Sequence, residues 1–128
     1  MDIDKPADIY NADCPSRDVL DLVASKWAML VVCTLRDGLK RTGTLRRAIS
    51  GISQKMLTQT LRDLERNGII SRVEYAEVPP HVEYELTATG RSLSHLMKDM
   101  EFWIVDHYDG IMSARERFGC RERGLFSG

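Results

Sequence analysis

The middle of the chain carries the clearest pattern of apolar and polar positions. At about 100° per residue, one narrow apolar stripe holds Leu57, Leu61 and Leu64. The opposite face holds Lys55, Gln59, Arg62 and Arg66. Ser53 can cap the first turn with its hydroxyl, and Gly68 suits the left-handed position just past a helix end. The pattern predicts one amphipathic helix between Ser53 and Gly68, with a basic, amide-rich outer face.

Two helices are predicted in the first third of the chain. The first follows Pro15, with Ser16 as its N-cap. Its expected buried face is Val19, Leu20, Leu22 and Val23. The second runs from about Lys26 to Arg36 and is apolar almost all round. A helix without a polar face is predicted to lie at the centre of the core.

A short helix is predicted just before the amphipathic one. Lys40–Thr42 can form a very short strand, and the helix begins near Gly43 or Thr44. Its expected inward residues are Leu45, Ala48 and Ile49. Ser50–Ile52 then forms a tight turn that contains glycine. A short helix, a turn and a longer helix with a basic outer face are typical of a helix-turn-helix, although other helical hairpins share this outline.

Two strands are predicted directly after the amphipathic helix. Residues 69–75 and 82–86 alternate apolar and polar positions, as half-buried strands do. The segment 76–81 between them is expected to be the loop, because Pro79 and Pro80 cannot donate hydrogen bonds to a ladder. A hairpin at this place in the chain is typical of a winged helix.

Thr87 is predicted to cap a long last helix from about Ala88 to Met112. Its apolar stripe is roughly 140° wide, and a small winged domain has little core left to cover it. We therefore expect a homodimer in which two of these helices pack across a two-fold axis. A helix that folds back on its own domain is the alternative. The predicted interface residues are Leu93, Met97, Met100, Trp103, Ile104, Tyr108 and Ile111.

These elements predict a mainly α fold with a small β-hairpin, a winged helix-turn-helix with a long C-terminal dimerisation helix. Residues 1–13 are expected to be a flexible arm and residues 14–87 the winged helix-turn-helix. Residues 88–112 would be the dimerisation helix of the same domain, and residues 113–128 a C-terminal tail. The chain of 128 residues has the length of one ordinary domain.

The charge is distributed unevenly along the chain. The net charge is −1, yet residues 36–72 contain nine Lys or Arg against three Asp or Glu. This middle region therefore carries +6 and the remainder −7. A basic region of this kind is expected where a surface attracts phosphates, although a solvated surface can have the same composition.

Other signals point to a cytoplasmic protein without a membrane segment. The first eight residues lack the basic and apolar regions of a secretion signal, and no apolar run is long enough to cross a bilayer. Three cysteines without close pairing argue against a disulfide framework or a zinc site. The three histidines lack zinc-ligand spacing, and no phosphate loop or nucleophile motif is present. No cofactor, metal or catalytic residue is therefore expected.

Taken together, these motifs resemble those of HxlR-type transcriptional regulators, a bacterial winged-helix family. The similarity covers roughly residues 14–110. The motifs that carry it are Cys14-Pro15, Lys26-Trp27, Leu45-Arg46-Arg47, Gly51–Thr58, Val78-Pro79-Pro80, Val82–Thr87 and Gly90-Arg91. The resemblance implies a dimeric regulator of transcription that binds a two-fold-related DNA operator. His81 stands where the wing of the family commonly carries Arg or Lys, which reduces the attraction expected between wing and phosphate.

The helix between Ser53 and Gly68 would then lie in the major groove of double-stranded DNA. The predicted recognition-helix contacts are Ser53, Gln54, Lys55, Thr58, Gln59 and Arg62. The predicted phosphate and wing contacts are Lys40, Arg41, Arg46, Arg47, Arg72 and His81. Gln can pair with adenine in a bidentate way, through the oxygen and the nitrogen of its amide, and Arg or Lys can reach guanine or phosphate.

Cys14 is the candidate effector site. The helix N-terminus and Arg17 are expected to favour its thiolate, whereas Asp13 and Asp18 oppose it. The resemblance implies a sensor of oxidants or electrophiles here, because Cys-Pro cysteines have that role in some members. The alternatives are an unreactive thiol, a regulator switched by a small ligand, and a winged-helix protein-interaction module without DNA binding. The operator sequence, the regulated genes, the sign of regulation and the effector are left open.

Overall fold

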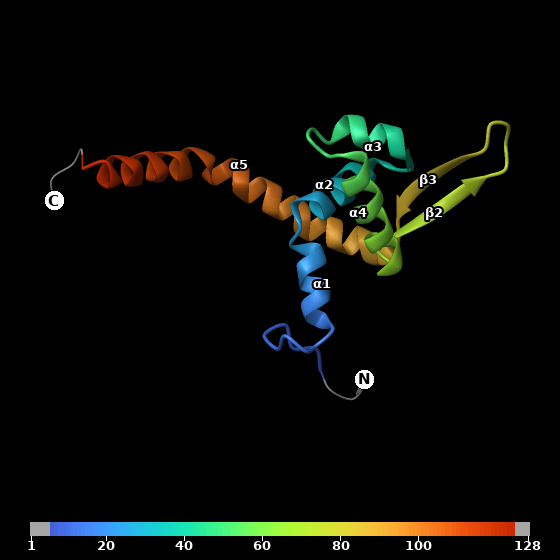
Figure 1. The fold of residues 1–128 in the computed structure, drawn as a ribbon, viewed down its shortest axis with the longest axis horizontal. Coiled ribbons are helices and arrows are strands. Elements are labelled where there is room, and N and C mark those ends of the chain that lie inside the picture. The colour runs from blue at the N-terminus through green and yellow to red at the C-terminus, as the bar shows by residue number, and fades with distance from the viewer. Residues whose placement is uncertain (1–5, 125–128) are drawn as a thin grey trace. The chain divides into compact units, whose positions relative to one another are not determined.

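The computed structural model describes residues 6–124. Two compact units divide the chain, the first ending at His95 and the second beginning at Leu96. The helices are α1 Ser16–Val23, α2 Lys26–Thr34, the short 3-10 helix η1 Leu35–Asp37, α3 Thr42–Ala48, α4 Gln54–Arg66 and α5 Ala88–Glu122. The strands are β1 Lys40–Arg41, β2 Ile70–Tyr75 and β3 His81–Leu86 (Figure 1). No helix in the described range is long and apolar enough to cross a membrane.

A small antiparallel sheet of three strands includes the wing, which is the β2–β3 hairpin of residues 70–86. β3 lies between β1 and β2, so that Lys40 pairs with Tyr84 and Ile70 with Leu86. The pairing of Tyr75 with His81 closes the hairpin around residues 76–80. The hairpin projects beyond α3 and α4 in Figure 1. The predicted strands are confirmed, but His81 belongs to β3 rather than to the loop, because its backbone already pairs across the ladder.

The core of the first unit is built around α2, as its apolar composition predicts. Ala28, Val31 and Val32 have no exposed surface, and Leu35 is 2% exposed. The other buried apolar side chains of this unit are Leu45, Ile49, Ile52, Leu57, Leu61, Leu64, Ile69, Ile70 and Leu86. α4 packs on α2 through its leucine stripe, and this packing turns the opposite face of α4 outward.

A tight junction joins α4, β2 and the start of α5. Gly68 has φ +72°, the left-handed conformation expected just past a helix end. The Thr87 hydroxyl donates to the Gly68 and Ile69 carbonyls, at 2.6 and 3.0 Å, and accepts from the Gly90 amide at 3.1 Å. A Cβ at Gly90 would fall on the Ile69 carbonyl oxygen. Thr87 is therefore the cap of α5, as predicted, and Gly90 allows the helix to approach β2.

Several local predictions need correction. Pro15, not Ser16, is the N-cap residue of α1, and Ser16 is the first helical residue. Val19 and Leu20 are 44% and 36% exposed, so the apolar face of α1 is not buried in the single chain. Ala48 is exposed, whereas Leu45 and Ile49 on either side of it are buried as predicted.

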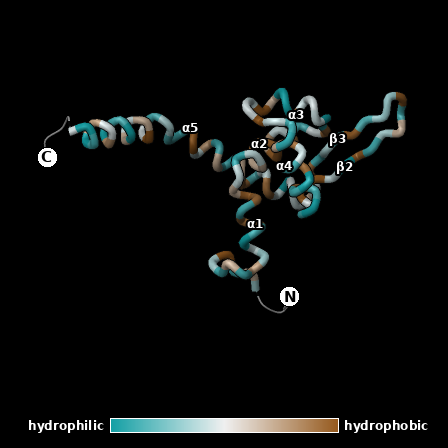
Figure 2. Tube along the Cα trace, in the orientation of Figure 1, coloured by the Kyte–Doolittle hydropathy of each residue, from teal (hydrophilic) through white to brown (hydrophobic). Residues whose placement is uncertain are grey.

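α5 is ten residues longer than expected, because it continues past Met112 to Glu122. Most of the segment predicted to be a tail is therefore helical, and residues 125–128 lie outside the described part. Apolar and hydrophilic positions alternate along this helix (Figure 2). The expected arm also contains structure, since turns close between Asp8 and Cys14, whereas residues 1–5 lie outside the described part.

Candidate nucleic-acid interface

α4 presents the predicted recognition face because both ends of the helix and its buried side are fixed. The Ser53 hydroxyl accepts from the Met56 amide at 3.0 Å, which caps the first turn. Gly51, with φ +86°, provides the turn that leads into this cap. The five other predicted recognition-helix residues are all exposed: Gln54, Lys55, Thr58, Gln59 and Arg62.

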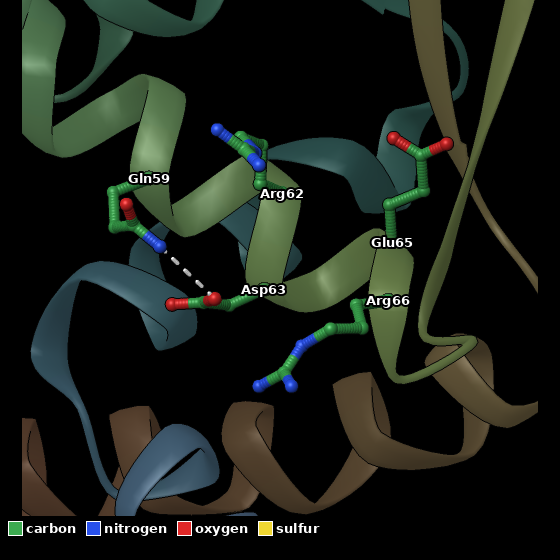
Figure 3. Close-up of a pocket in the computed structure, with 5 residues that line it drawn as sticks. All are labelled: Gln59, Arg62, Asp63, Glu65 and Arg66. Carbon is green, nitrogen blue, oxygen red and sulfur yellow. Dashed lines mark hydrogen bonds between the residues drawn. The ribbon is translucent and has the colours of Figure 1, made fainter.

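Two side-chain hydrogen bonds order the outer face of α4. The Gln54 amide donates to the Thr58 hydroxyl at 3.2 Å, and the Gln59 amide donates to Asp63 at 3.1 Å (Figure 3). Both pairs are four residues apart, the spacing at which helical side chains meet. The Gln59 amide therefore has a defined orientation before any ligand binds.

The sequence patterns missed the acidic residues on the same helix. An open pocket along α4 is lined by Gln59, Arg62, Asp63, Glu65 and Arg66 (Figure 3). Asp63 and Glu65 reduce the positive charge of this surface toward the C-terminal end of the helix. The spacing of four residues between Gln59 and Asp63 could have predicted that these two side chains meet on the helix surface. The part of α4 that is free of acidic residues is its N-terminal half.

Basic side chains from α3 flank the recognition face. Arg46 and Arg47 are both exposed, and Arg47 donates to the Thr44 hydroxyl at 3.4 Å. Neither arginine has a carboxylate partner within 4 Å in the described part of the chain. Lys40 is half-buried on β1 and likewise lacks such a partner. These three cations can reach phosphates without first breaking an ion pair.

The remaining phosphate candidates lie beside carboxylates. Arg72 pairs with Glu74 at 3.2 Å, and Arg41 lies 4.0 Å from Glu83. Residues 70–86 contain one arginine and four glutamates, a net charge of −3 with His81 neutral. The wing therefore repels phosphate more than the list of its basic residues predicts.

His81 is enclosed by its neighbours rather than directed outward. Its ring stacks on Tyr75 with centroids 4.5 Å apart, and only 15% of its side chain is exposed. Glu77 and Glu83 lie 3.8 and 3.9 Å from its two ring nitrogens. The pKa of Tyr75 is raised above its ordinary value, chiefly by a hydrogen bond with Glu83 and secondly by desolvation. The network holds the two wing strands together near the tip.

Cys14 is partly buried at the start of α1 and accepts two hydrogen bonds. The Asp8 amide donates to its Sγ at 3.4 Å and the Ser16 hydroxyl at 3.1 Å. These two bonds lower the pKa of Cys14 from its ordinary value, and the bond from Asp8 makes the larger contribution. Arg17 was expected to act on the thiol, but its guanidinium instead donates to the carbonyls of Ile9 and Tyr10.

The predicted dimer stripe on α5 is largely exposed in the single chain. Met100, Trp103, Ile104 and Tyr108 are between 46% and 56% exposed, and Leu93 and Ile111 are half-buried. Met97 is only 2% exposed, so it is already buried before any partner binds. Trp103 stacks on His107 with centroids 4.5 Å apart. Six of the seven predicted interface residues therefore have surface available for a partner.

Comparison with known proteins identifies the family. The model described as HxlR-like helix-turn-helix matches residues 22–112. The chain belongs to the HxlR-like helix-turn-helix family. It is 40% identical over 112 residues to the HTH-type transcriptional regulator YtfH of Escherichia coli K12, covering 88% of this chain and 89% of the relative. This HxlR-like chain is thus a transcriptional regulator of the helix-turn-helix type.

Solved structures agree with the fold. The putative transcriptional regulator YtfH from Salmonella typhimurium is 41% identical with a TM-score of 0.81, over 87% of this chain and 99% of that one. The reduced form of the redox regulator HypR is 39% identical with a TM-score of 0.70, over 77% of this chain and 98% of that one. The predicted winged helix-turn-helix is confirmed, whereas Cys14 lies outside the residues matched by the HxlR-like model.

Proposed function

We propose that this HxlR-like regulator binds double-stranded DNA as a homodimer on an inverted-repeat operator, with α4 in the major groove. The observation that carries the proposal is the outer face of α4, a capped and packed helix whose exposed side chains are amides, a hydroxyl and cations. These groups match the donors and acceptors on base edges in the major groove. The acidic wing contributes little to the attraction of phosphates.

Base contacts and phosphate contacts have different roles. Gln54, Lys55 and Gln59 select the sequence, because their side chains can form hydrogen bonds with base edges. Arg46 and Arg47 on α3 supply affinity that is independent of sequence and falls as salt rises. The exposed α5 stripe joins two copies and sets the distance between the two α4 helices.

The test compares Gln59→Ala with Arg46→Ala in binding-site selection from random DNA and in fluorescence anisotropy at several salt concentrations. Gln59→Ala should lose about 1 to 3 kcal/mol of discrimination at one base pair of each half-site. Arg46→Ala should weaken binding to all sequences alike and reduce the salt slope by about one unit.

Two results would contradict this assignment. An unchanged sequence preference in Gln59→Ala would remove this residue from base readout. Failure of the wild-type chain to enrich any sequence with inverted symmetry would favour the alternative function, a winged-helix module for protein interaction. An Asp109→Ala variant, altered at an exposed site on the side of α5 opposite the stripe, controls for general effects of substitution.

We also propose that oxidants or electrophiles regulate the protein through Cys14. The hydrogen bonds that lower its pKa increase the thiolate fraction at neutral pH, and the thiolate is the reactive form. The similarity to HypR, a redox regulator, supports regulation of this chain by oxidants. Diamide should change operator affinity in the wild type and leave it unchanged in Cys14→Ser.

A further inference from the structure

The start of α2 lies beside the N-terminal end of the recognition helix. Cη2 of Trp27 is 4.0 Å from the position that a Cβ on Gly51 would occupy, in the turn that leads into α4. Ser25, the residue before α2, lines the same cleft as Met56 of α4. Lys26 stands between Ser25 and Trp27 in the chain, so its backbone is held close to the start of α4.

The first turn of α2 is fixed by its own cap and by the core. The Ser25 hydroxyl accepts from the Ala28 amide at 3.5 Å, and Ala28 has no exposed surface. Side chains that start from this turn therefore have a defined origin. Trp27 is half-buried, whereas Lys26 is exposed.

The Lys26 side chain lies over an aromatic ring instead of beside a carboxylate. Its Nζ is 4.6 Å from the centroid of the Trp27 ring, a distance typical of a cation–π contact. No carboxylate lies within 4 Å of this nitrogen in the described part of the chain. The ring restricts the side chain without offsetting its charge, whereas the carboxylates beside Arg41 and Arg72 offset theirs. The ammonium group has three donors, so those that point away from the ring can bind an anion.

The position of this cation suits a phosphate of the DNA backbone. Residues at the N-terminal end of a recognition helix contact base edges in helix-turn-helix complexes. The major groove is only about 12 Å wide, so the phosphates on its two sides pass close to the start of such a helix. A lysine held beside the Gly51 turn, two residues before the Ser53 cap, lies at this end of α4.

We propose that Lys26 binds a backbone phosphate of the operator and that Trp27 is the residue that positions it. The contact rests on the proposed DNA-binding function and adds a phosphate anchor outside α3, α4 and the wing. It supplies affinity that is independent of sequence, as phosphate contacts do. Because the Trp27 ring contacts both the cation and the Gly51 turn, it fixes the distance between the phosphate anchor and the start of α4.

The contact is tested by fluorescence anisotropy with the selected operator, at salt concentrations from about 50 to about 200 mM. Lys26→Ala should weaken binding and reduce the slope of log affinity against log salt by about one unit for each half-site. The advantage of the wild type should therefore shrink roughly threefold per half-site over this range. Lys26→Arg should keep most of the affinity and the slope, because it keeps a cation over the ring.

Lys98→Ala is the matched control. Lys98 is also an exposed lysine over an aromatic ring, 5.7 Å from the centroid of Phe102, but it belongs to α5 in the second unit. Its loss should change neither the affinity nor the salt slope. Urea denaturation verifies that each variant keeps the stability of the wild type.

A double-mutant cycle tests the role of Trp27. Without the ring, Lys26 is less restricted, so Lys26→Ala should cost less DNA affinity in a Trp27→Leu background than in the wild type. Trp27→Phe keeps an aromatic face, should give an intermediate cost, and replaces Trp27→Leu in the cycle if that variant does not fold. Additive losses in the cycle would show that Trp27 does not position the lysine.

Either of two results would overturn the phosphate contact. They are an unchanged affinity and salt slope in Lys26→Ala, and an equal loss in Lys98→Ala. Normal wild-type binding with unchanged Lys26→Ala binding refutes this contact alone and leaves the proposed function standing. Absence of DNA binding by the wild type in every condition refutes the proposed function and the contact together.

Discussion

At the scale of single residues, hydrogen-bond partners decide which side chains are chemically available. Cys14 illustrates this, because its thiol accepts from the Asp8 amide and the Ser16 hydroxyl. The sequence suggested the helix end and Arg17 as the causes of a low pKa. The structure assigns that effect first to the Asp8 amide, six residues upstream, and then to the Ser16 hydroxyl. The contribution of Asp8 is not indicated by any local pattern at Cys-Pro.

Ser16→Ala should make Cys14 less reactive. Loss of the hydroxyl donor removes a hydrogen bond to Sγ, so the pKa of Cys14 rises toward its ordinary value and the thiolate fraction at pH 7 falls. The rate of alkylation by iodoacetamide, followed by mass spectrometry from pH 6 to 9, should therefore shift to higher pH, with at least a twofold lower rate at pH 7.

Ser16→Thr is the matched control, because it keeps a hydroxyl at the same position. Its alkylation profile should stay close to that of the wild type. Cys120, which accepts from Arg123 at 3.4 Å, serves as an internal reference in every sample. An unchanged profile for Cys14 in Ser16→Ala would show that the hydroxyl does not affect the thiolate.

At the scale of elements, the helices with local start and stop signals were predictable. The cap at Ser53, the left-handed Gly68 and the leucine stripe of α4 all depend on neighbours within a few residues. Long-range pairing was not predictable in the same way. The ion pairs of Arg41 and Arg72 and the stacking of His81 on Tyr75 depend on the strand register, which the alternation pattern alone does not define.

α5 shows why the end of an element can be missed. The predicted end at Met112 followed the loss of the apolar period. The next ten residues lack that period but contain Ala, Arg and Glu, which favour helix on intrinsic propensity. The prediction that the apolar face of α1 is buried was wrong for a different reason. An amphipathic pattern identifies the apolar face of a helix, but it does not say whether the same chain or another one covers that face.

Gly90→Ala should destabilise the first unit. The added Cβ would meet the Ile69 backbone carbonyl, which cannot move without disturbing β2 and the Thr87 cap. We expect a loss of about 1 to 3 kcal/mol in the free energy of unfolding, measured by urea denaturation. Gly110→Ala is the control, since nothing lies within 4 Å of its Cβ and alanine favours helix. Equal stability of the two variants would exclude a tight contact at Gly90.

At the scale of the whole molecule, the charges separate by element. Cations without partners lie on α3 and on the N-terminal half of α4, whereas the wing carries a net −3. In the proposed complex, a DNA duplex approaching the first unit would therefore be attracted to α3 and α4 and repelled by the wing. This polarity supports an orientation in which α4 carries most of the recognition.

Apolar surface at this scale supports association of two copies. Trp103 and Ile104 are 56% and 46% exposed on the predicted stripe of α5, and large exposed apolar surfaces are typical of protein interfaces. Phe102 is also exposed, at 63%, but the helical period places it on the opposite side of α5 and Lys98 lies over its ring. The stripe and Phe102 therefore provide a matched pair of sites for testing the dimer.

Sedimentation equilibrium should give twice the chain mass of 14.6 kDa for the wild type at micromolar concentration. Ile104→Glu places a charge in the centre of the stripe and should weaken the dimer by about 2 kcal/mol or more, which is roughly thirtyfold in the dissociation constant. Phe102→Glu introduces the same charge on the other side and should leave the dimer intact. A monomeric wild type, or equal loss in both variants, would contradict an interface formed by the stripe.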